Sequence, residues 1–203
     1  MTNHTEIFQH YFDTQFWGTD VSTSGPNSDP KFTPQLRLQL QQLLNELAPT
    51  TLLDAGCGDA NLIQYLDLKD THYIGVDCVP GLVAQAQATF ADTINRQFMV
   101  LDIVTEPLPK AELVLCRDVV HYLPNNLIAR FLDNVKHSGA KYLLITHNTQ
   151  CATSANDVTE IGKFRPVNLC YPPFHFPEPK QVIMEDFFAK GLALFTRDQL
   201  SWS

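Results

Sequence analysis

The sequence lacks three features that would assign it to a common class of protein. None of the five cysteines forms a Cys-x-x-Cys pair, so we expect reduced cysteines, no disulfide framework and no metal site. Basic residues never form a run longer than a pair and the net charge is -8, which argues against a nucleic-acid partner. No stretch approaches the roughly 20 apolar residues of a membrane-spanning helix, so no membrane partner is expected.

A targeting signal is not indicated either, because residues 1–6 contain no basic stretch followed by an apolar run. We therefore expect a soluble, cytoplasmic protein. Its 203 residues are 44% hydrophobic and 18% charged, which suits one globular domain over residues 1–203 and is short for two. The oligomeric state does not follow from these features.

The most informative stretch is residues 51–63, where an apolar run reaches Asp54 and continues through Gly56, Cys57 and Gly58. This pattern predicts a buried strand, a tight turn on glycines and the first turn of a helix. Such a turn presents backbone N–H groups to a polar ligand beyond the strand. We interpret it as the ligand-binding loop of a doubly wound sheet.

Short apolar strands and helices alternate after this turn. Strands are expected at 72–76, 97–101, 112–116 and 141–146, and helices at 62–66, 80–91 and 125–135. The first three of these strands are followed by Asp77, Asp102 and Arg117-Asp118. The alternation predicts a parallel sheet with helices on both faces and ligands beyond the carboxyl ends of the strands.

The two ends of the chain differ from this core. An aromatic stripe of Phe8, Phe12 and Phe16 predicts a helix over residues 7–17 that packs on the core. A polar loop at 18–30 separates it from a helix at 34–47, for which Thr33 is the expected N-cap. Residues 147–180 are irregular and proline-rich, and strands at 182–184 and 192–195 lie too close in sequence for a crossover helix, which predicts an antiparallel hairpin.

The carboxylates at the strand ends indicate the ligand. Asp77 follows the glycines by about 20 residues, which suits hydrogen bonds to the ribose hydroxyls of NAD or S-adenosylmethionine. NAD requires a third glycine where Asn61 stands, and its pyrophosphate is disfavoured beside Asp54 and Asp59. A sulfonium cofactor without phosphate tolerates these charges, and Asp102 adds an acceptor for the adenine amine.

The chain resembles the class I, Rossmann-like S-adenosylmethionine-dependent methyltransferases. The motifs that carry the resemblance are Leu53-Asp54-Ala55-Gly56-Cys57-Gly58, Gly75-Val76-Asp77, Leu101-Asp102-Ile103 and Leu115-Cys116-Arg117-Asp118-Val119-Val120-His121-Tyr122-Leu123. The resemblance covers about residues 34–146 and implies a seven-stranded sheet with an antiparallel closing strand. Ala60 departs from the family pattern, in which many members carry another glycine, and this leaves the loop path open.

The resemblance also implies the cofactor contacts. Asp54, Gly56 and Gly58 are expected at the methionine part, Asp77 at the ribose, and Asp102 with Ile103 at the adenine. We add Cys57, Cys78, Arg117, Trp17 and Arg37 as further cofactor-binding candidates, with Arg37 either reaching the methionine carboxylate or remaining a solvated surface residue.

Methyl transfer requires alignment of the acceptor with the methyl group, and a base where the acceptor is a hydroxyl or a protonated amine. His121 is the first candidate for this base, because its unperturbed pKa lies near neutrality, although it can equally be a packing residue. Asp118 is expected either to orient the acceptor or His121, or to cap the following helix. His147 and His175 are alternative bases.

Aromatic residues form the last group of candidates. Trp17, Tyr122, Tyr171, Phe174 and Phe176 are expected either to face the sulfonium and acceptor or to form a small core under the proline-rich loop. The loop at 18–30 and the irregular segment are expected to close over the cofactor from two sides.

These expectations divide the domain into four parts. They are a helix and cofactor-covering loop (1–33), a cofactor-binding core (34–146), a substrate segment (147–180) and a closing hairpin (181–203). Without a basic groove or added domain, a small-molecule methyl acceptor is favoured. A protein or nucleic-acid acceptor and a noncatalytic nucleoside-binding role remain alternatives, and the methylated atom is open.

Overall fold

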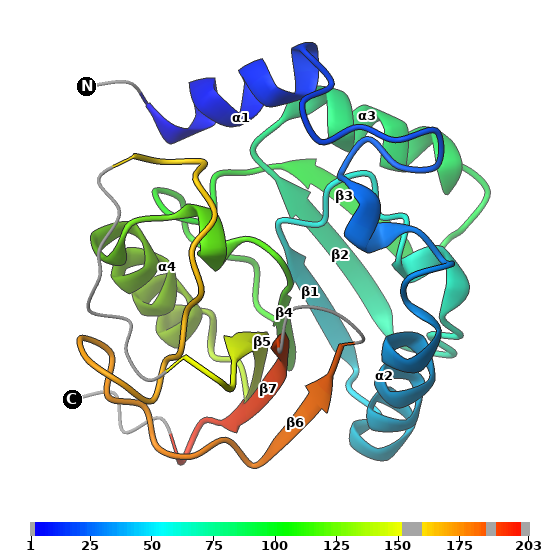
Figure 1. The fold of residues 1–203 in the computed structure, drawn as a ribbon. Coiled ribbons are helices and arrows are strands. Elements are labelled where there is room, and N and C mark those ends of the chain that lie inside the picture. The colour runs from blue at the N-terminus through cyan, green and yellow to red at the C-terminus, as the bar shows by residue number, and fades with distance from the viewer. Residues whose placement is uncertain (1–2, 152–159, 186–189, 200–203) are drawn as a thin grey trace.

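The computed structural model describes residues 3–151, 160–185 and 190–199 and shows an α/β fold built on one mixed sheet (Figure 1). Within these residues seven strands lie in the order β3-β2-β1-β4-β5-β7-β6. They are β1 (Thr51–Ala55), β2 (His72–Asp77), β3 (Arg96–Val100), β4 (Leu113–Cys116), β5 (Tyr142–Asn148), β6 (Gln181–Met184) and β7 (Lys190–Thr196). The first five are parallel, and β7 pairs antiparallel with both β5 and β6. The predicted sheet and its antiparallel hairpin are confirmed.

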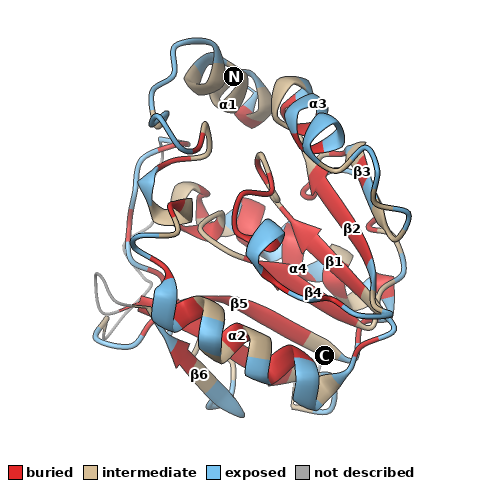
Figure 2. Ribbon diagram, turned by 90° about the vertical axis from the view of Figure 1, so that its right-hand side faces the viewer, coloured by how far each residue is buried: buried red, intermediate tan, exposed pale blue. Residues whose placement is uncertain are grey.

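Helices cover both faces of this sheet. They are α1 (His4–Asp13), α2 (Pro34–Leu47), α3 (Pro80–Thr89) and α4 (Asn125–Ser138). Figure 2 shows α2 and α3 on the outside of the sheet, with buried strands behind them. Leu40 of α2 and Val83 of α3 belong to the core on one face, whereas Phe131 of α4 belongs to the core on the other. On the face of α4, irregular chain that includes Val167 and Leu169 contributes to the core as well.

The strands are apolar throughout because both sides of the sheet are covered. Leu52 and Leu53 are neighbours in β1, yet each belongs to a different core and neither is more than 1% exposed. Alternate side chains of a strand point to opposite faces, so this burial requires cover on both.

Local signals explain the bounds of α2. Pro34 occupies its first turn, and Ala48, with a φ of 40°, ends it. The expected N-cap Thr33 makes no side-chain capping bond, because its hydroxyl donates instead to the Asp29 carbonyl. Leu36, Leu40, Leu43 and Leu44 form its buried face.

The structure corrects two predicted helices. The helix at 7–17 is α1, which begins at His4 and ends at Asp13, because Gln15 has a φ of 53° and turns the chain. The prediction of a helix at 62–66 is wrong, since only a short 3₁₀ turn, Ile63–Tyr65, follows the glycines. Ala60 has a φ of 57°, and the Asp59 side chain accepts from the Asn61 N–H, which competes with helical hydrogen bonds. The glycine turn therefore does not lead into the N-terminus of an α-helix.

Two expected segments lie partly outside the described residues. They are the loop of the hairpin, of which residues 186–189 are not described, and the irregular segment, of which residues 152–159 are not described. Among the described helices, none has the length and hydropathy needed to cross a membrane.

Candidate functional site

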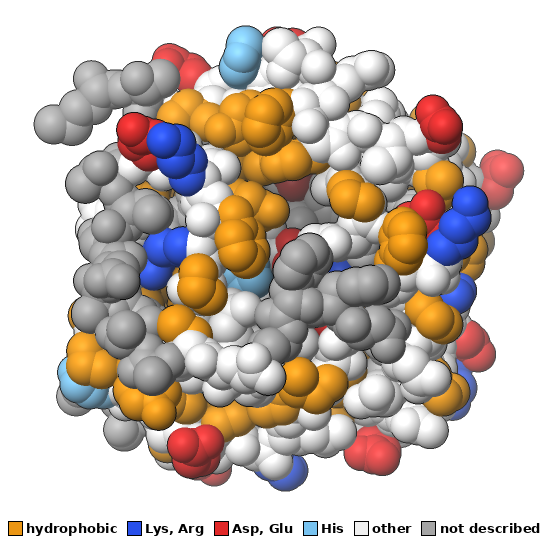
Figure 3. Space-filling model, viewed as in Figure 1, with side chains coloured by type: hydrophobic (Ala, Val, Ile, Leu, Met, Phe, Trp, Pro, Cys, Tyr) orange, Lys and Arg blue, Asp and Glu red, His pale blue; other side chains and the backbone are white. Residues whose placement is uncertain are grey.

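A cavity lies at the carboxyl ends of β1, β2 and β4, beneath α1 and the loop at 23–28. Figure 3 shows the hollow near the middle of this face, bordered by hydrophobic side chains. Most of the site residues expected from the sequence line it: Trp17, Asp54, Gly56, Cys57, Gly58, Asp77, Cys78, Asp102, Ile103, Arg117 and Asp118. The parallel arrangement of β1, β2 and β4 brings these distant positions to one edge.

The glycine turn forms the floor of the cavity. Gly56 and Gly58 have φ values of 83° and 58°, which L-residues with side chains rarely adopt. The N–H groups of Gly56 and Cys57 donate to the Val76 carbonyl at 2.8 and 3.0 Å. The Gly58 N–H donates to Asp77 Oδ2 at 3.0 Å. The turn after β1 is thereby tied to the end of β2.

Asp59 holds a covering loop over this floor. Its carboxylate accepts from the Ser22 hydroxyl at 2.9 Å, the Thr23 N–H at 2.9 Å and the Ser24 hydroxyl at 3.0 Å. A Cβ on Gly58 would overlap Ser24, so the loop packs directly against the glycine. Sequence reasoning missed this anchor, although a carboxylate next to the glycines and a Ser-Thr-Ser run in the loop were signals for it.

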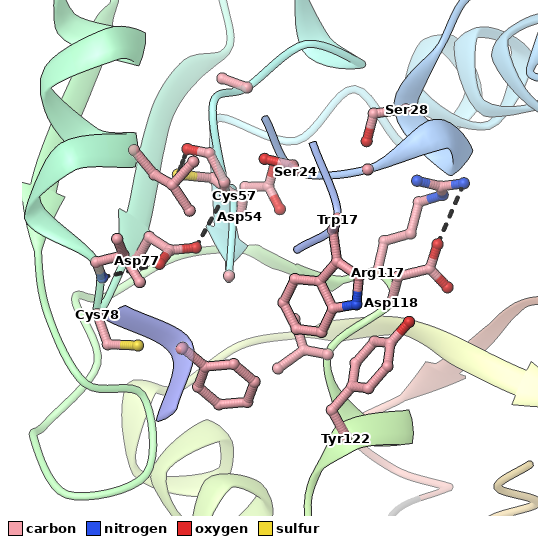
Figure 4. A pocket seen from close by; sticks show the side chains of 18 of the residues that line it. Trp17, Ser24, Ser28, Asp54, Cys57, Asp77, Cys78, Arg117, Asp118 and Tyr122 are labelled. Carbon is pink, nitrogen blue, oxygen red and sulfur yellow. Dashed lines mark hydrogen bonds and ion pairs between the residues drawn. The ribbon is translucent and has the colours of Figure 1, made fainter. Parts of the chain in front are cut away.

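Two carboxylates, those of the buried Asp54 and the half-buried Asp77, stand beside the turn. The Tyr73 hydroxyl donates to Asp54 Oδ2 at 2.8 Å. Burial raises the pKa of Asp54 to about 6, despite the lowering effect of this hydrogen bond. Burial also raises the pKa of Asp77, although backbone N–H groups of Gly58 and Val79 donate to it. Figure 4 shows both carboxylates close to the cavity.

Asp102 is joined to the N-terminal helix. His4 Nε2 lies 2.9 Å from both oxygens of Asp102, and the Val104 N–H donates to the same carboxylate at 2.9 Å. Burial raises the pKa of Asp102, but the hydrogen bonds from His4 and Thr105 outweigh it and hold the pKa at about 2. His4 itself lines the cavity, and no sequence pattern pointed to it.

Aromatic rings from α1 and the following turn make a second wall. Phe8, Tyr11, Phe12 and Trp17 all line the cavity, together with Tyr122 after β4. The ring centroids of Trp17 and Tyr122 lie 4.9 Å apart, and those of Trp17 and Tyr11 lie 4.7 Å apart. Phe8 and Phe12 of the predicted aromatic stripe therefore line the cavity, rather than only packing on the core as expected from the sequence, whereas Phe16 lies beyond the end of α1 and is exposed.

The far end of the cavity carries Arg117 and Asp118, which follow β4. Arg117 Nη2 lies 2.6 Å from Glu185 Oε2, and Lys190 Nζ lies 2.5 Å from Asp118 Oδ1. Asp118 has a φ of 57°, and its N–H donates to the Thr146 hydroxyl at 2.7 Å. Burial raises the pKa of Asp118, but the charges of Arg117 and Lys190 outweigh it and hold the pKa at about 2.

Comparison with known proteins shows what this arrangement resembles. Residues 53–139, from β1 through α4, match the family model of a methyltransferase domain. This part of the chain is therefore similar to methyltransferase domains. No curated protein matches it by sequence.

Solved methyltransferases share the fold of this domain. Magnesium protoporphyrin IX methyltransferase from Synechocystis PCC 6803, with bound S-adenosylmethionine, superposes with a TM-score of 0.65 at 14% identity, covering 97% of this chain and 98% of that one. TehB from Haemophilus influenzae gives 0.59 at 14% identity, covering 83% and 66%. Phosphoethanolamine N-methyltransferase 1 from Haemonchus contortus gives 0.53 at 15% identity, covering 80% and 36%.

His121 is not among the residues that line the cavity. It is 1% exposed, its Nδ1 lies 3.9 Å from Asp118 Oδ1, and the ring of Phe164 packs against it at 5.0 Å. Burial lowers its pKa to about 4. The structure therefore corrects the expectation that His121 faces the acceptor. The alternative bases His147 and His175 also lie outside the cavity lining.

Arg37 is directed away from the cavity as well. Its Nε and Nη2 donate to the carbonyls of Thr33 and Pro30 at 3.3 and 3.2 Å, and its guanidinium lies over the ring of Tyr65. It supports the start of α2 and the covering loop. The structure does not bring it to the place where the methionine carboxylate was expected.

Of the two segments expected to close over the cofactor, only the loop at 18–30 lines the cavity among the described residues. The loop at 18–30 contributes residues 23–28 to the cavity, whereas none of the residues at 166–179 lines it. Phe174 and Phe176 pack against the core instead, with Phe176 edge-on to Phe195 at 5.2 Å. Tyr171 is largely exposed. Of the five expected aromatic residues, only Trp17 and Tyr122 face the cavity.

The first prediction concerns the close packing of the covering loop against the glycine turn. Gly58→Ala and Gly139→Ala both place a side chain at positive φ, but only the former meets another atom, because nothing lies within 4 Å of a Cβ at Gly139. Both substitutions should lower the free energy of unfolding by about 1–2 kcal/mol through φ strain. Gly58→Ala should lower it by about 1–3 kcal/mol more and weaken cofactor binding. If denaturant titrations show equal losses in the free energy of unfolding for the two variants, the covering loop does not pack directly on Gly58.

The second prediction uses the buried, neutral His121. Its folded pKa of about 4 lies below the unfolded value of 6.5, so the unfolded state binds more protons as the pH falls from about 6.5 towards 4. This should cost up to about 3 kcal/mol of stability across that window. Asp54, with a folded pKa of about 6 against 3.8, acts in the opposite direction over the same range.

The comparison of wild type with His121→Gln isolates the histidine, because both proteins retain Asp54. The stability of the variant should rise relative to wild type as the pH is lowered from 7 to 4 in denaturant titrations. Parallel curves for the two proteins would show that His121 is not held neutral.

Proposed function

We propose that the cavity binds S-adenosylmethionine and that the protein transfers its methyl group to a small-molecule acceptor by in-line displacement. The observation that carries this proposal is the convergence of the glycine turn, Asp77 and Asp102 on a single cavity that ends at Arg117 and Asp118. The fold neighbour from Synechocystis was solved with bound S-adenosylmethionine and with bound S-adenosylhomocysteine, which supports the same use here.

The charges of the cavity favour this cofactor. Asp54, Asp77 and Asp102 line it and Asp59 lies next to it, so a dinucleotide pyrophosphate would meet like charges. A sulfonium carries a positive charge and gains from the same field. Asp77 would accept from the ribose hydroxyls, and Asp102 with Ile103 would receive the adenine. The turn at 56–58, together with Asp54, would hold the methionine part of the cofactor. Cys57 and Cys78 would lie beside the cofactor.

The aromatic wall suits the reacting end of this cofactor. Trp17 and Tyr122 lie beside Arg117 and Asp118 in Figure 4. Aromatic faces attract cations, and a dry surface around the sulfonium favours displacement at the methyl carbon. With the glycine turn behind the methionine part, the methyl group would point towards Asp118, which orients the acceptor.

The size of the acceptor follows from the cover of the cavity. The helix α1 and the loop at 23–28 lie over it, held through His4 and Asp59. A protein or nucleic-acid acceptor would need an open groove, and nucleic acid would in addition require a basic one. A small molecule is therefore the acceptor that we propose.

The proposal predicts the ligand preference of the purified protein. Titration calorimetry should detect S-adenosylmethionine and S-adenosylhomocysteine with micromolar affinity and no NADH binding. Asp77→Asn should weaken S-adenosylhomocysteine at least tenfold, because charge-assisted hydrogen bonds are worth about 1.5–3 kcal/mol. Asp92→Asn changes an exposed carboxylate and should leave the affinity unchanged. Binding of NADH alone would refute the proposal.

A further inference from the structure

A buried network of four charged side chains adjoins the cavity. Arg117 and Asp118 come from the end of β4, Glu185 follows β6, and Lys190 begins β7. Besides the short contacts described above, Lys190 Nζ lies 3.5 Å from Glu185 Oε2 and Arg117 Nη2 lies 3.5 Å from Asp118 Oδ2. The cofactor contacts proposed above leave Glu185 and Lys190 without a role.

The burial of this network is costly. The side chains of Arg117 and Glu185 are 7% exposed, and that of Lys190 is 2% exposed. Lysine is almost never so buried unless it is paired. In buried ion pairs the attraction between the charges rarely exceeds the free-energy cost of removing them from water. The network has two positive and two negative charges, so it is formally neutral. A gain in fold stability is a weak explanation for it, which points to a functional one.

Three of its atoms lack hydrogen-bond partners among the described residues. They are Arg117 Nε, a donor, and two acceptors, Asp118 Oδ2 and Glu185 Oε1. Buried polar atoms are nearly always satisfied, and exceptions are common where a ligand completes them. Glu185 does not line the cavity, whereas Arg117 and Asp118 do, and Figure 4 shows the guanidinium of Arg117 and the carboxylate of Asp118 next to each other at its end. An unfilled donor therefore stands beside an unfilled acceptor.

A hydroxyl can fill both positions at once. Its oxygen accepts from Arg117 while its hydrogen is donated to Asp118. An ammonium group has no lone pair to accept a hydrogen bond from Arg117, and its positive charge is repelled by the guanidinium. A carboxylate is repelled by the negative charge of Asp118. Either ion would also add an unpaired charge to a neutral, buried network.

We propose that Arg117 and Asp118 form the acceptor subsite for an uncharged alcohol or phenol, so that the methyl group is transferred to oxygen, and that Lys190 is the positioning residue for Asp118. This inference rests on the function proposed above. Both unfilled atoms are enclosed in the structure. Binding of the hydroxyl therefore requires the side chains around these two atoms to move aside.

The reaction at this subsite balances without another reactant. The hydroxyl oxygen forms a bond to the methyl carbon as the carbon–sulfur bond breaks, and that electron pair stays on sulfur to give a neutral thioether. The O–H becomes strongly acidic as the new bond forms, so even a carboxylate of low basicity accepts its proton. Asp118 receives the proton and returns it to solvent after the product leaves.

Lys190 fixes which oxygen of Asp118 is available. Its ammonium holds Oδ1, which leaves Oδ2 for the acceptor. The titratable groups that face Asp118 are Arg117, Lys190, His121, Tyr122 and Cys116, and the two cations Arg117 and Lys190 keep its carboxylate ionised. The sequence separates Lys190 from Asp118 by 72 residues, so this pairing exists only in the folded chain.

The nature of the methylated atom can be tested with labelled cofactor. Purified protein is incubated with methyl-labelled S-adenosylmethionine and a deproteinised pool of small metabolites, and the labelled product is treated with base. We expect a base-stable methyl ether. A base-labile methyl ester or a labelled methylamine would overturn the hydroxyl subsite but leave the proposed function intact. No labelled small molecule at all would refute the proposed function.

The positioning role is tested on the same product by pH profiles. Lys190→Met should lower kcat about tenfold or more and move the acid limb of the kcat profile upward by at least one pH unit, whereas Lys190→Arg should keep the limb near its wild-type position. Retained affinity for S-adenosylhomocysteine shows that each variant is folded. A Lys190→Met profile that superimposes on that of wild type would overturn the positioning role.

Discussion

The hydrogen bond between the Gly58 N–H and the Asp77 carboxylate is the constraint on which the site depends. It ties the turn after β1 to the end of β2, two strands whose parallel register runs from Thr51 opposite His72 to Ala55 opposite Val76. One residue further along, Asp59 holds the covering loop. The geometry of one turn thus positions both the floor of the cavity and its cover, and a side chain at Gly58 would disturb both.

Charge is distributed unevenly along the cavity. Carboxylates from β1, β2 and the chain after β3 surround one part, each with hydrogen bonds that fix its position. At the other end, two cations and two carboxylates cancel one another. A cationic cofactor is attracted by the first part, and an uncharged acceptor suits the second. The two halves of the proposed reaction therefore have separate electrostatic environments.

The sequence predicted what depends on local pattern. Each strand, the polar residue at its end and the closing hairpin follow from apolar runs and turns, and these place eleven candidate residues in one cavity. The sequence could not predict partners that are distant along the chain, such as His4 with Asp102 or Lys190 with Asp118. It also failed where side chains compete with the backbone, since Asp59 and the positive φ of Ala60 prevent the helix expected after the glycines.

A crystal structure of the complex with S-adenosylhomocysteine tests the assignment of the cavity most directly. The ribose hydroxyls should lie within hydrogen-bond distance of Asp77, the homocysteine part over the turn at 56–58, and the sulfur should face Arg117 and Asp118. A ligand bound outside this cavity, or one with its sulfur directed away from Asp118, would contradict the assignment.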